Sequence, residues 1–356
     1  MEEKKEMQSG EQTVHKRRPR YKGTHPRKFS EKYKELNPEK YADTVQKIID
    51  KGNTPAGMHI SIMVDEILDF LDIKPGQKGL DATLGYGGHT LAMLKKLDHQ
   101  GHIVGLDVDP VESQKTKERL LSKGFNEEDI TVKLINFANI DKVAEEFGLF
   151  DFVLADLGVS SMQIDDPSRG FSFKHEGPLD LRLDPSHGIP ASERLKKVTY
   201  EEFVNMLIEN SDEPYADQIA HEVFHRRKHH IPIETTKDLY DVIETALSFL
   251  PKKDRKDMVK KSCQRTFQAL RIDINNEFGV LTAFLQKLPE ILKPGGRVAI
   301  LTFHSGEDRL VKKSFKALQR EGIYSEAARD VIRPSYDECK RNSRATSTKM
   351  RWAIKA

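Results

Sequence analysis

Three glycines and a histidine, Gly85, Gly87, Gly88 and His89, follow a short apolar segment and precede a helix-like pattern. Glycine lacks a Cβ atom, so the backbone at these positions can adopt positive φ angles and approach a ligand closely. The helix expected to begin near His89 presents free backbone N–H groups, which favour a carboxylate or a phosphate. Residues 80–89 therefore predict a turn that binds a nucleotide-like cofactor. The alternative is an ordinary strand-to-helix turn.

Asp107 ends the next expected strand, about 20 residues beyond the glycine turn. A carboxylate at this spacing can accept hydrogen bonds from both hydroxyls of a ribose. The dinucleotide fingerprint G-x-G-x-x-G fits poorly, because Thr90 stands where its third glycine belongs. The sequence also contains no G-x-x-x-x-G-K-[ST] phosphate-binding loop. These two observations disfavour an oxidoreductase and an NTPase.

Strand-like and helix-like patterns alternate on both sides of the turn. Strands are expected at 78–82, 102–106, 130–135, 151–155, 297–303 and 350–354, and helices at 59–70, 90–97, 111–121, 274–292 and 307–318. This order predicts an α/β fold with a mostly parallel, Rossmann-like sheet. Ligands of such sheets bind beyond the carboxyl ends of the strands, so the residues that end the first four strands should converge.

The chain has 356 residues, enough for two domains, and a formal net charge of +2. A prediction that the protein binds nucleic acid must therefore rest on local basic patches and not on the total charge. Cys263 and Cys339 lie far apart without metal-ligand spacing, which indicates a reducing compartment. The apolar runs are far shorter than the roughly 20 residues that span a bilayer, and the charged N-terminus lacks a signal-peptide core. We expect a cytoplasmic protein with no membrane partner.

Residues 1–57 predict a basic, flexible N-terminal arm. Residues 15–29 contain seven Lys or Arg and no acidic residue. Tyr21 and Phe29 in this stretch could stack on bases. We expect the arm to contact RNA; the alternatives are a solvated tail and a targeting segment.

The alternation of strands and helices stops after Asp156, and a long charged region with helical patterns follows. It predicts an inserted helical domain at 165–269, between two parts of a sheet domain at 58–164 and 270–356. Basic patches at 225–230 and 252–265 could follow an RNA backbone, although a charge run is commonly a solvated helix face. The histidines at 225–230 do not predict a metal site, because adjacent side chains point in different directions.

Several long segments resemble the RsmH (MraW) family of S-adenosylmethionine-dependent ribosomal RNA methyltransferases. The resemblance covers residues 59–356 and rests on segments 81–89, 136–137, 156–163, 169–173, 178–182, 265–272, 303–309 and 333–351. It implies a class I methyltransferase sheet with a helical insertion. It also implies methylation of the N4 amine of a cytidine in small-subunit ribosomal RNA, with S-adenosyl-L-methionine as the cofactor.

The resemblance assigns a role to individual residues. Gly85, Gly87, Gly88 and His89 would hold the methionine end of the cofactor and Asp107 its ribose. Phe137 would lie against the adenine, and Asp156 and Gln163 would complete the pocket. Without the resemblance, Phe137 would be interpreted as a core residue and Gln163 as a surface residue.

The reaction limits what else to look for. The amine of cytosine is a poor nucleophile because its lone pair is delocalised into the ring, so an acceptor that orients its hydrogens should help. We expect Asp156, or a carbonyl of the turn at 157–161, to be that acceptor. The Asp/Asn-Pro-Pro-aromatic segment of many amino-methyltransferases is absent. Expected contacts to the RNA substrate are Ser160, Ser161, Arg169, Arg182, Arg265, His304 and Arg309. His304 could instead be a hydrogen-bonding residue at a strand end.

The chain also departs from the family pattern. Ser61 and Gly306 replace a proline and an apolar residue, and segments 212–214 and 261–263 replace Gly-Glu-Glu and His-Pro-Ala. These changes suggest a divergent paralogue that keeps the cofactor chemistry. A non-catalytic ribosome assembly factor and a methyltransferase of a different RNA remain alternatives. The sequence leaves open whether the partner is free RNA or the assembled small subunit, and whether the protein is a monomer or a homodimer.

Overall fold

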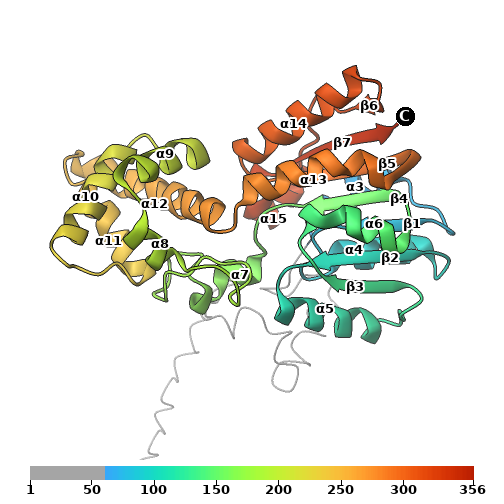
Figure 1. The fold of residues 1–356 in the computed structure, drawn as a ribbon, viewed down its shortest axis with the longest axis horizontal. Helices are drawn as coiled ribbons and strands as arrows, with labels where there is room; N and C mark the ends of the chain where they lie inside the picture. Colours follow the sequence, from blue (N-terminus) through green and yellow to red (C-terminus); the bar gives the residue numbers. More distant parts are fainter. Residues whose placement is uncertain (1–60) are drawn as a thin grey trace, which may run out of the picture. The chain divides into compact units, whose positions relative to one another are not determined.

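One mixed sheet of seven strands organises the part of the chain that the structure describes, in the order β3-β2-β1-β4-β5-β7-β6 (Figure 1). The computed structural model describes residues 61–356, so the expected arm at 1–57 lies outside it. The strands are β1 (Lys78–Asp81), β2 (His102–Asp107), β3 (Ile130–Leu134), β4 (Phe150–Asp156), β5 (Leu292–Thr302), β6 (Tyr324–Ala327) and β7 (Lys349–Lys355). Strands β1 to β5 are parallel, and β7 is antiparallel to both β5 and β6. The predicted α/β fold class is confirmed.

Helices cover both faces of the sheet. Val153 and Ala155 of β4 face one core, and Phe152 and Leu154 face the other, because successive side chains of a strand point to opposite faces. The first core contains residues of α6 (Ile140–Phe147), α13 (Glu277–Ile291) and α14 (Ser305–Arg320), and the second contains residues of α3 (Val64–Leu71), α4 (Gly88–Leu97) and α5 (Pro110–Ser122). Burial on both faces explains why the strands are almost continuously apolar.

The region between β4 and β5 forms a separate helical core, which Figure 1 shows beside the sheet. Phe203, Val223 and Cys263 are among its fully buried residues. Its helices are α8 (Ala191–Lys197), α9 (Tyr200–Ser211), α10 (Ala216–Lys228), α11 (Thr236–Ala246) and α12 (Lys252–Ile274). The short helix α7 (Ser161–Asp165) precedes this region, and α15 (Tyr336–Arg341) lies near the C-terminal end of the chain.

The structure differs from the expected elements in two places. The helix expected at 274–292 is interrupted, because Asn276 has a left-handed φ of 48°, and α13 begins only at Glu277. Asparagine is among the few residues other than glycine that tolerate this conformation. Strand β6, with only four residues, was not expected, because so short a segment carries little alternation.

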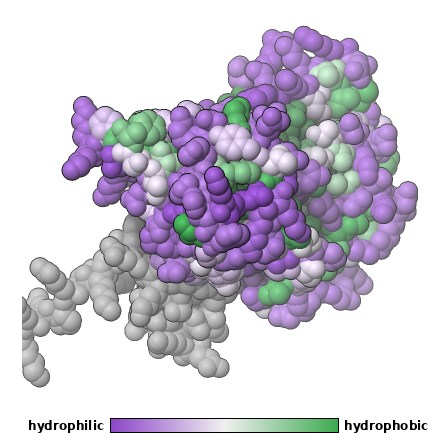
Figure 2. Space-filling model, turned by 60° about the vertical axis from the view of Figure 1, so that its left-hand side comes forward, coloured by the Kyte–Doolittle hydropathy of each residue, from purple (hydrophilic) through white to green (hydrophobic). Residues whose placement is uncertain are grey.

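The described residues include no helix that is long and apolar enough to cross a membrane. In Figure 2 hydrophilic residues cover most of the visible face, and the hydrophobic residues lie in separate small groups.

Candidate active site

A cavity of about 520 Å³ lies at the carboxyl ends of the central strands. The order of the strands in the sheet changes direction there, between β1 and β4. The volume of the cavity is typical of a small-molecule site, and its position is the expected one for an open α/β sheet. All of the residues predicted to hold the cofactor line this cavity: Gly85, Gly87, Gly88, His89, Asp107, Phe137, Asp156 and Gln163.

The glycine turn leaves no room for side chains. Gly87 precedes α4 with a φ of 77°, and a Cβ atom there would lie 2.6 Å from Cγ2 of Thr116. A Cβ atom on Gly88 would lie 2.0 Å from Oγ of Ser61. The Thr116 hydroxyl also donates a 2.6 Å hydrogen bond to the carbonyl oxygen of Gly85. The turn is thus fixed by α5 and by the segment before α3, with its backbone exposed to the cavity.

Asp107 ends β2 beside this turn. Its Oδ2 accepts a 2.9 Å hydrogen bond from the backbone N–H of Gly85, and its Oδ1 accepts one of 2.8 Å from that of Asp109. Burial raises the pKa of Asp107 to about 6, against the opposing effect of these hydrogen bonds. Each carboxylate oxygen has a second lone pair, so the group can still accept hydrogen bonds from ligand hydroxyls.

Phe137 and Gln163 both line the cavity. The ring of Phe137 packs edge-on against Phe284 with ring centroids 5.2 Å apart, so it has both a core contact and a cavity contact. The Oε1 atom of Gln163 accepts a hydrogen bond of 3.0 Å from the N–H of Ser160. Ser160 is the N-cap residue of α7. The Nε2 atom of Gln163 lies 3.5 Å from Oδ2 of Asp109. Gln163 is therefore fixed in place and is not an unconstrained surface residue.

The carboxylate of Asp156, at the end of β4, lies close to the imidazole of His89, and both residues line the cavity. The Oδ1 atom of Asp156 is buried and has no hydrogen-bond partner in the described chain, and its Oδ2 lies 3.5 Å from Nδ1 of His89. The other ring nitrogen of His89 lies 2.8 Å from the carbonyl oxygen of Ile62. Burial raises the pKa of Asp156 to about 6, although His89 opposes the shift. A buried carboxylate with an unused oxygen is suited to accept a hydrogen from a ligand.

Helix α12 contributes a polar stripe that we did not predict from the sequence. Gln264, Gln268, Arg271 and Asn275 all line the cavity, and their spacing of four, three and four residues places them on one helix face. This spacing was the available signal, and two of the four residues, Gln268 and Arg271, lie in the segment 265–272 already singled out. Side chains from the helical region therefore form one wall of the cavity.

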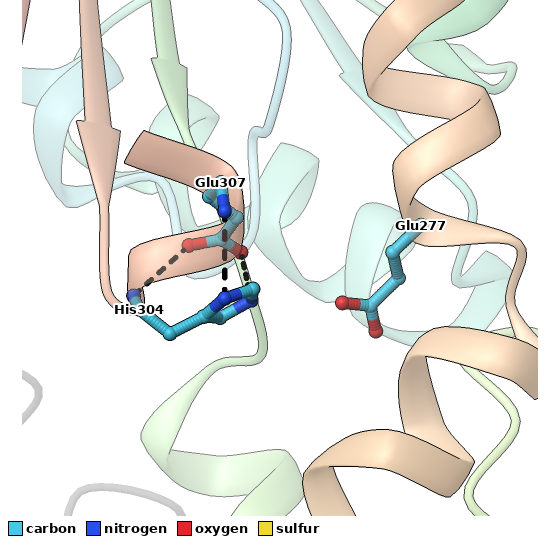
Figure 3. Close-up of side chains that lie close together, drawn as sticks. All are labelled: Glu277, His304 and Glu307. Carbon is cyan, nitrogen blue, oxygen red and sulfur yellow. Dashed lines mark hydrogen bonds and ion pairs between the residues drawn. The ribbon is translucent and has the colours of Figure 1, made fainter. Parts of the chain in front are cut away.

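Glu277, His304 and Glu307 lie close enough together to resemble a cation site, with potential ligand atoms within 4.8 Å of one another. Figure 3 shows the carboxylate of Glu277 pointing from α13 toward the imidazole, while His304 and Glu307 lie at the start of α14. However, Arg271 donates hydrogen bonds of 2.8 and 2.9 Å to the two oxygens of Glu277. Its permanent positive charge opposes a bound cation, so we assign no metal here.

His304 and Glu307 form a reciprocal pair. The N–H of Glu307 donates to Nδ1 of His304, and Nε2 of His304 lies 3.1 Å from Oε1 of Glu307. Burial disfavours the charge on Glu307, but the hydrogen bond from His304 and the nearby Arg271 outweigh it and leave its pKa below the usual value. An ionised Glu307 therefore adds negative charge near Asp156.

The expected RNA contacts divide into two groups. Ser160 and His304 line the cavity, and Ser161 begins α7 next to it. The four arginines Arg169, Arg182, Arg265 and Arg309 do not line it. Arg169 donates 2.8 Å hydrogen bonds to Oδ2 of Asp109 and to the carbonyl oxygen of Leu183, and Arg182 pairs with Asp180 at 2.8 Å. Arg309 is exposed and Arg265 is partly exposed. Contact of these arginines with RNA remains a prediction.

Comparisons with known proteins agree on one family. The family model described as "MraW methylase family" matches residues 56–356. "Ribosomal RNA small subunit methyltransferase H 1" of Lachnoclostridium phytofermentans is 67% identical over 97% of this chain and 94% of that protein. The protein of the same name from Agathobacter rectalis is 64% identical over 97% and 99%. "Ribosomal RNA small subunit methyltransferase H" of Clostridioides difficile is 37% identical over 83% and 98%. The two alignments that cover 97% of this chain must include part of residues 1–57.

Proposed function

Because this chain belongs to the MraW methylase family and is an S-adenosylmethionine-dependent small-subunit rRNA (cytosine-N4-)-methyltransferase, we propose that cofactor and cytidine meet in the cavity at the carboxyl edge of its sheet. The observation that carries this proposal is the convergence of the glycine turn, Asp107, Phe137 and Asp156 on one cavity, which also has a polar wall from α12.

The cofactor lies along the ends of β1, β2 and β4 in this proposal. The methionine end contacts the backbone at Gly87 and Gly88, where the start of α4 offers free N–H groups to a carboxylate. The ribose hydroxyls donate to Asp107, and the adenine lies against Phe137. Gln163 closes the pocket from α7.

The cytosine amine lies beside Asp156, whose free Oδ1 accepts one of its hydrogens. This hydrogen bond orients the amine so that the nitrogen lone pair points at the methyl group in line with the carbon–sulfur bond. Holding the two reacting atoms about 3 to 3.5 Å apart supplies much of the rate acceleration. Ser160, at the start of α7, shapes the turn that follows Asp156.

The polar stripe of α12 lines the substrate side of the cavity. Amide and guanidinium groups can donate hydrogen bonds to O2 and N3 of cytosine. N3 distinguishes cytosine from uracil, whose N3 carries a hydrogen, and unstacked RNA bases are commonly recognised in this way. We propose that residues 165–269 form the insertion that recognises the substrate, with Gln264 and Gln268 nearest to this role. The partner is small-subunit rRNA, free or assembled, in the cytoplasm.

The decisive test is incubation with labelled methyl donor and small ribosomal subunits or naked rRNA, followed by nucleoside mass spectrometry. We expect N4-methylcytidine with the native protein and a loss of at least 100-fold with Asp156→Ala. The cofactor affinity of this variant should stay within about threefold of that of the native protein. Asp257→Ala, at an exposed position of α12, is the control and should behave as the native protein does. If cofactor and rRNA bind but no N4-methylcytidine forms, the protein is an assembly factor and the proposal is wrong.

A further inference from the structure

We propose that His89 is a positioning residue that shares with Asp156 the proton released by the methylated amine. This inference rests on the function proposed above. It concerns the side chain of His89, whereas the predicted cofactor contact at this position requires only the backbone at the start of α4.

The contacts of His89 fix which ring nitrogen carries hydrogen. Its Nε2 lies 2.8 Å from the carbonyl oxygen of Ile62, and a carbonyl oxygen can only accept a hydrogen bond. Nε2 is therefore the protonated nitrogen of the neutral ring, and Nδ1 carries a lone pair. That lone pair faces Oδ2 of Asp156 at 3.5 Å, longer than an ordinary hydrogen bond. Two acceptors thus face each other and would both gain from a proton between them.

The surrounding charges favour uptake of that proton. Asp81 at the end of β1 and Glu307 on α14 both act on Asp156 with negative charge, and His89 on α4 offsets that charge only when its ring is protonated. Asp81 accepts a 2.6 Å hydrogen bond from Thr90, and Glu307 is paired with His304, so neither offers a proton acceptor as open as Asp156. The raised pKa of Asp156, about 6, agrees with this arrangement.

The proton balance of the reaction gives the pair its role. The nitrogen lone pair forms the new N–C bond while the C–S bond breaks and its electron pair stays on sulfur, which becomes a neutral thioether. The amine nitrogen then carries a positive charge and two hydrogens. One of these passes as a proton to Oδ1 of Asp156, and rotation of the carboxyl group then brings it between Asp156 and Nδ1 of His89. It leaves to water when the products depart.

Substitution of His89 should shift the pH profile of methylation. His89→Gln can keep a donor toward Ile62 but removes Nδ1, so the protonated carboxyl of Asp156 loses the acceptor that shares its proton. The acidic limb of the single-turnover methylation rate should then move down by about 1 pH unit. His89→Asn places an amide donor near Asp156, which favours the carboxylate, and should also move this limb down. If both variants lower the rate by the same factor at every pH, His89 is only structural and the proposal is wrong.

A second measurement does not depend on methylation. We would record the imidazole nitrogen-15 NMR signals of the cofactor-free full-length protein and assign His89 by comparison with His89→Gln. We expect a neutral ring protonated on Nε2 at pH 8, and uptake of one proton by the pair near pH 6 that Asp156→Asn abolishes. A ring protonated on Nδ1 at pH 8 would overturn the proposal. Absence of N4-methylcytidine with the native protein would instead overturn the proposed function and leave this result unaffected.

Discussion

Ser262 donates a hydrogen bond of 2.8 Å to Glu213, and this bond joins the two segments, 212–214 and 261–263, where the chain departs from the family pattern. The side chain of Glu213 is fully buried, and its other oxygen has no hydrogen-bond partner in the described residues. Asp212 also lies 3.4 Å from Ser305, which precedes the third departure, Gly306. Three of the four departures therefore lie near one another in the structure.

Ser262→Ala should destabilise the protein by about 1 kcal/mol, because a buried carboxylate oxygen loses one of its two donors and keeps only the N–H of Tyr215. Urea unfolding measures this change. Ser248→Ala, at an exposed position, is the matched control and should stay within about 0.5 kcal/mol. Equal stability of the two variants would show that the bond between Ser262 and Glu213 contributes nothing.

Arg169→Met should destabilise the fold by about 3 kcal/mol, because Asp109 is buried and would lose its charged partner. Asp109 also contacts Gln163 and is the N-cap residue of α5. We therefore expect cofactor affinity to fall as well. An RNA-binding role makes a different prediction. If Arg169 contacts a phosphate, the slope of log affinity for rRNA against log salt concentration falls by about 1 while stability is unchanged.

Asp156→Asn should stabilise the cofactor-free protein above pH 6 while it abolishes methyl transfer. The pKa of Asp156 is raised from 3.8 to about 6, so its contribution to stability is present below pH 4 and is lost as pH rises through 6. Asparagine stays neutral and can donate to Nδ1 of His89. The difference should be near zero at pH 4 and reach about 1 to 3 kcal/mol at pH 8. Asp257→Asn, at an exposed position, is the control. If it changed the free energy of unfolding by the same amount between pH 4 and pH 8, this explanation would be wrong.

Gln264→Ala should weaken use of the RNA substrate without a change in stability or in cofactor affinity. Gln264 lines the cavity from α12 and is largely exposed. Loss of a hydrogen bond to the base should cost about 1 kcal/mol, or roughly fivefold in single-turnover kcat/KM. Lys260→Ala, one turn earlier on the same helix and exposed, serves as the control. A similar decrease in both variants would point to general charge or helix effects.

Deletion of residues 1–57 should weaken rRNA binding and reduce its salt dependence, because residues 15–29 contain seven Lys or Arg. Binding isotherms from 50 to 200 mM salt measure the slope. An unchanged slope would mean that the arm makes no contact with RNA phosphates.

The sequence predicted the sheet, and it singled out residues that line one cavity, because these signals are local. A buried parallel strand is an apolar run, and the glycine turn follows directly after β1. Contacts between distant segments could not be predicted in this way. Arg169 pairs with Asp109, which lies 60 residues earlier in the chain. The break at Asn276 depends on a backbone angle that hydrophobic periodicity does not report.

Asn275 connects the chain where it leaves the sheet region with the chain where it returns. Its side chain accepts a 2.8 Å hydrogen bond from the N–H of Leu183 and donates one of 2.8 Å to the carbonyl oxygen of Leu181. Asn275 thus ties the two ends of residues 184–274 to each other. We expect that exchange of this segment for the matching region of a 37% identical relative changes substrate recognition and leaves the cofactor site in place.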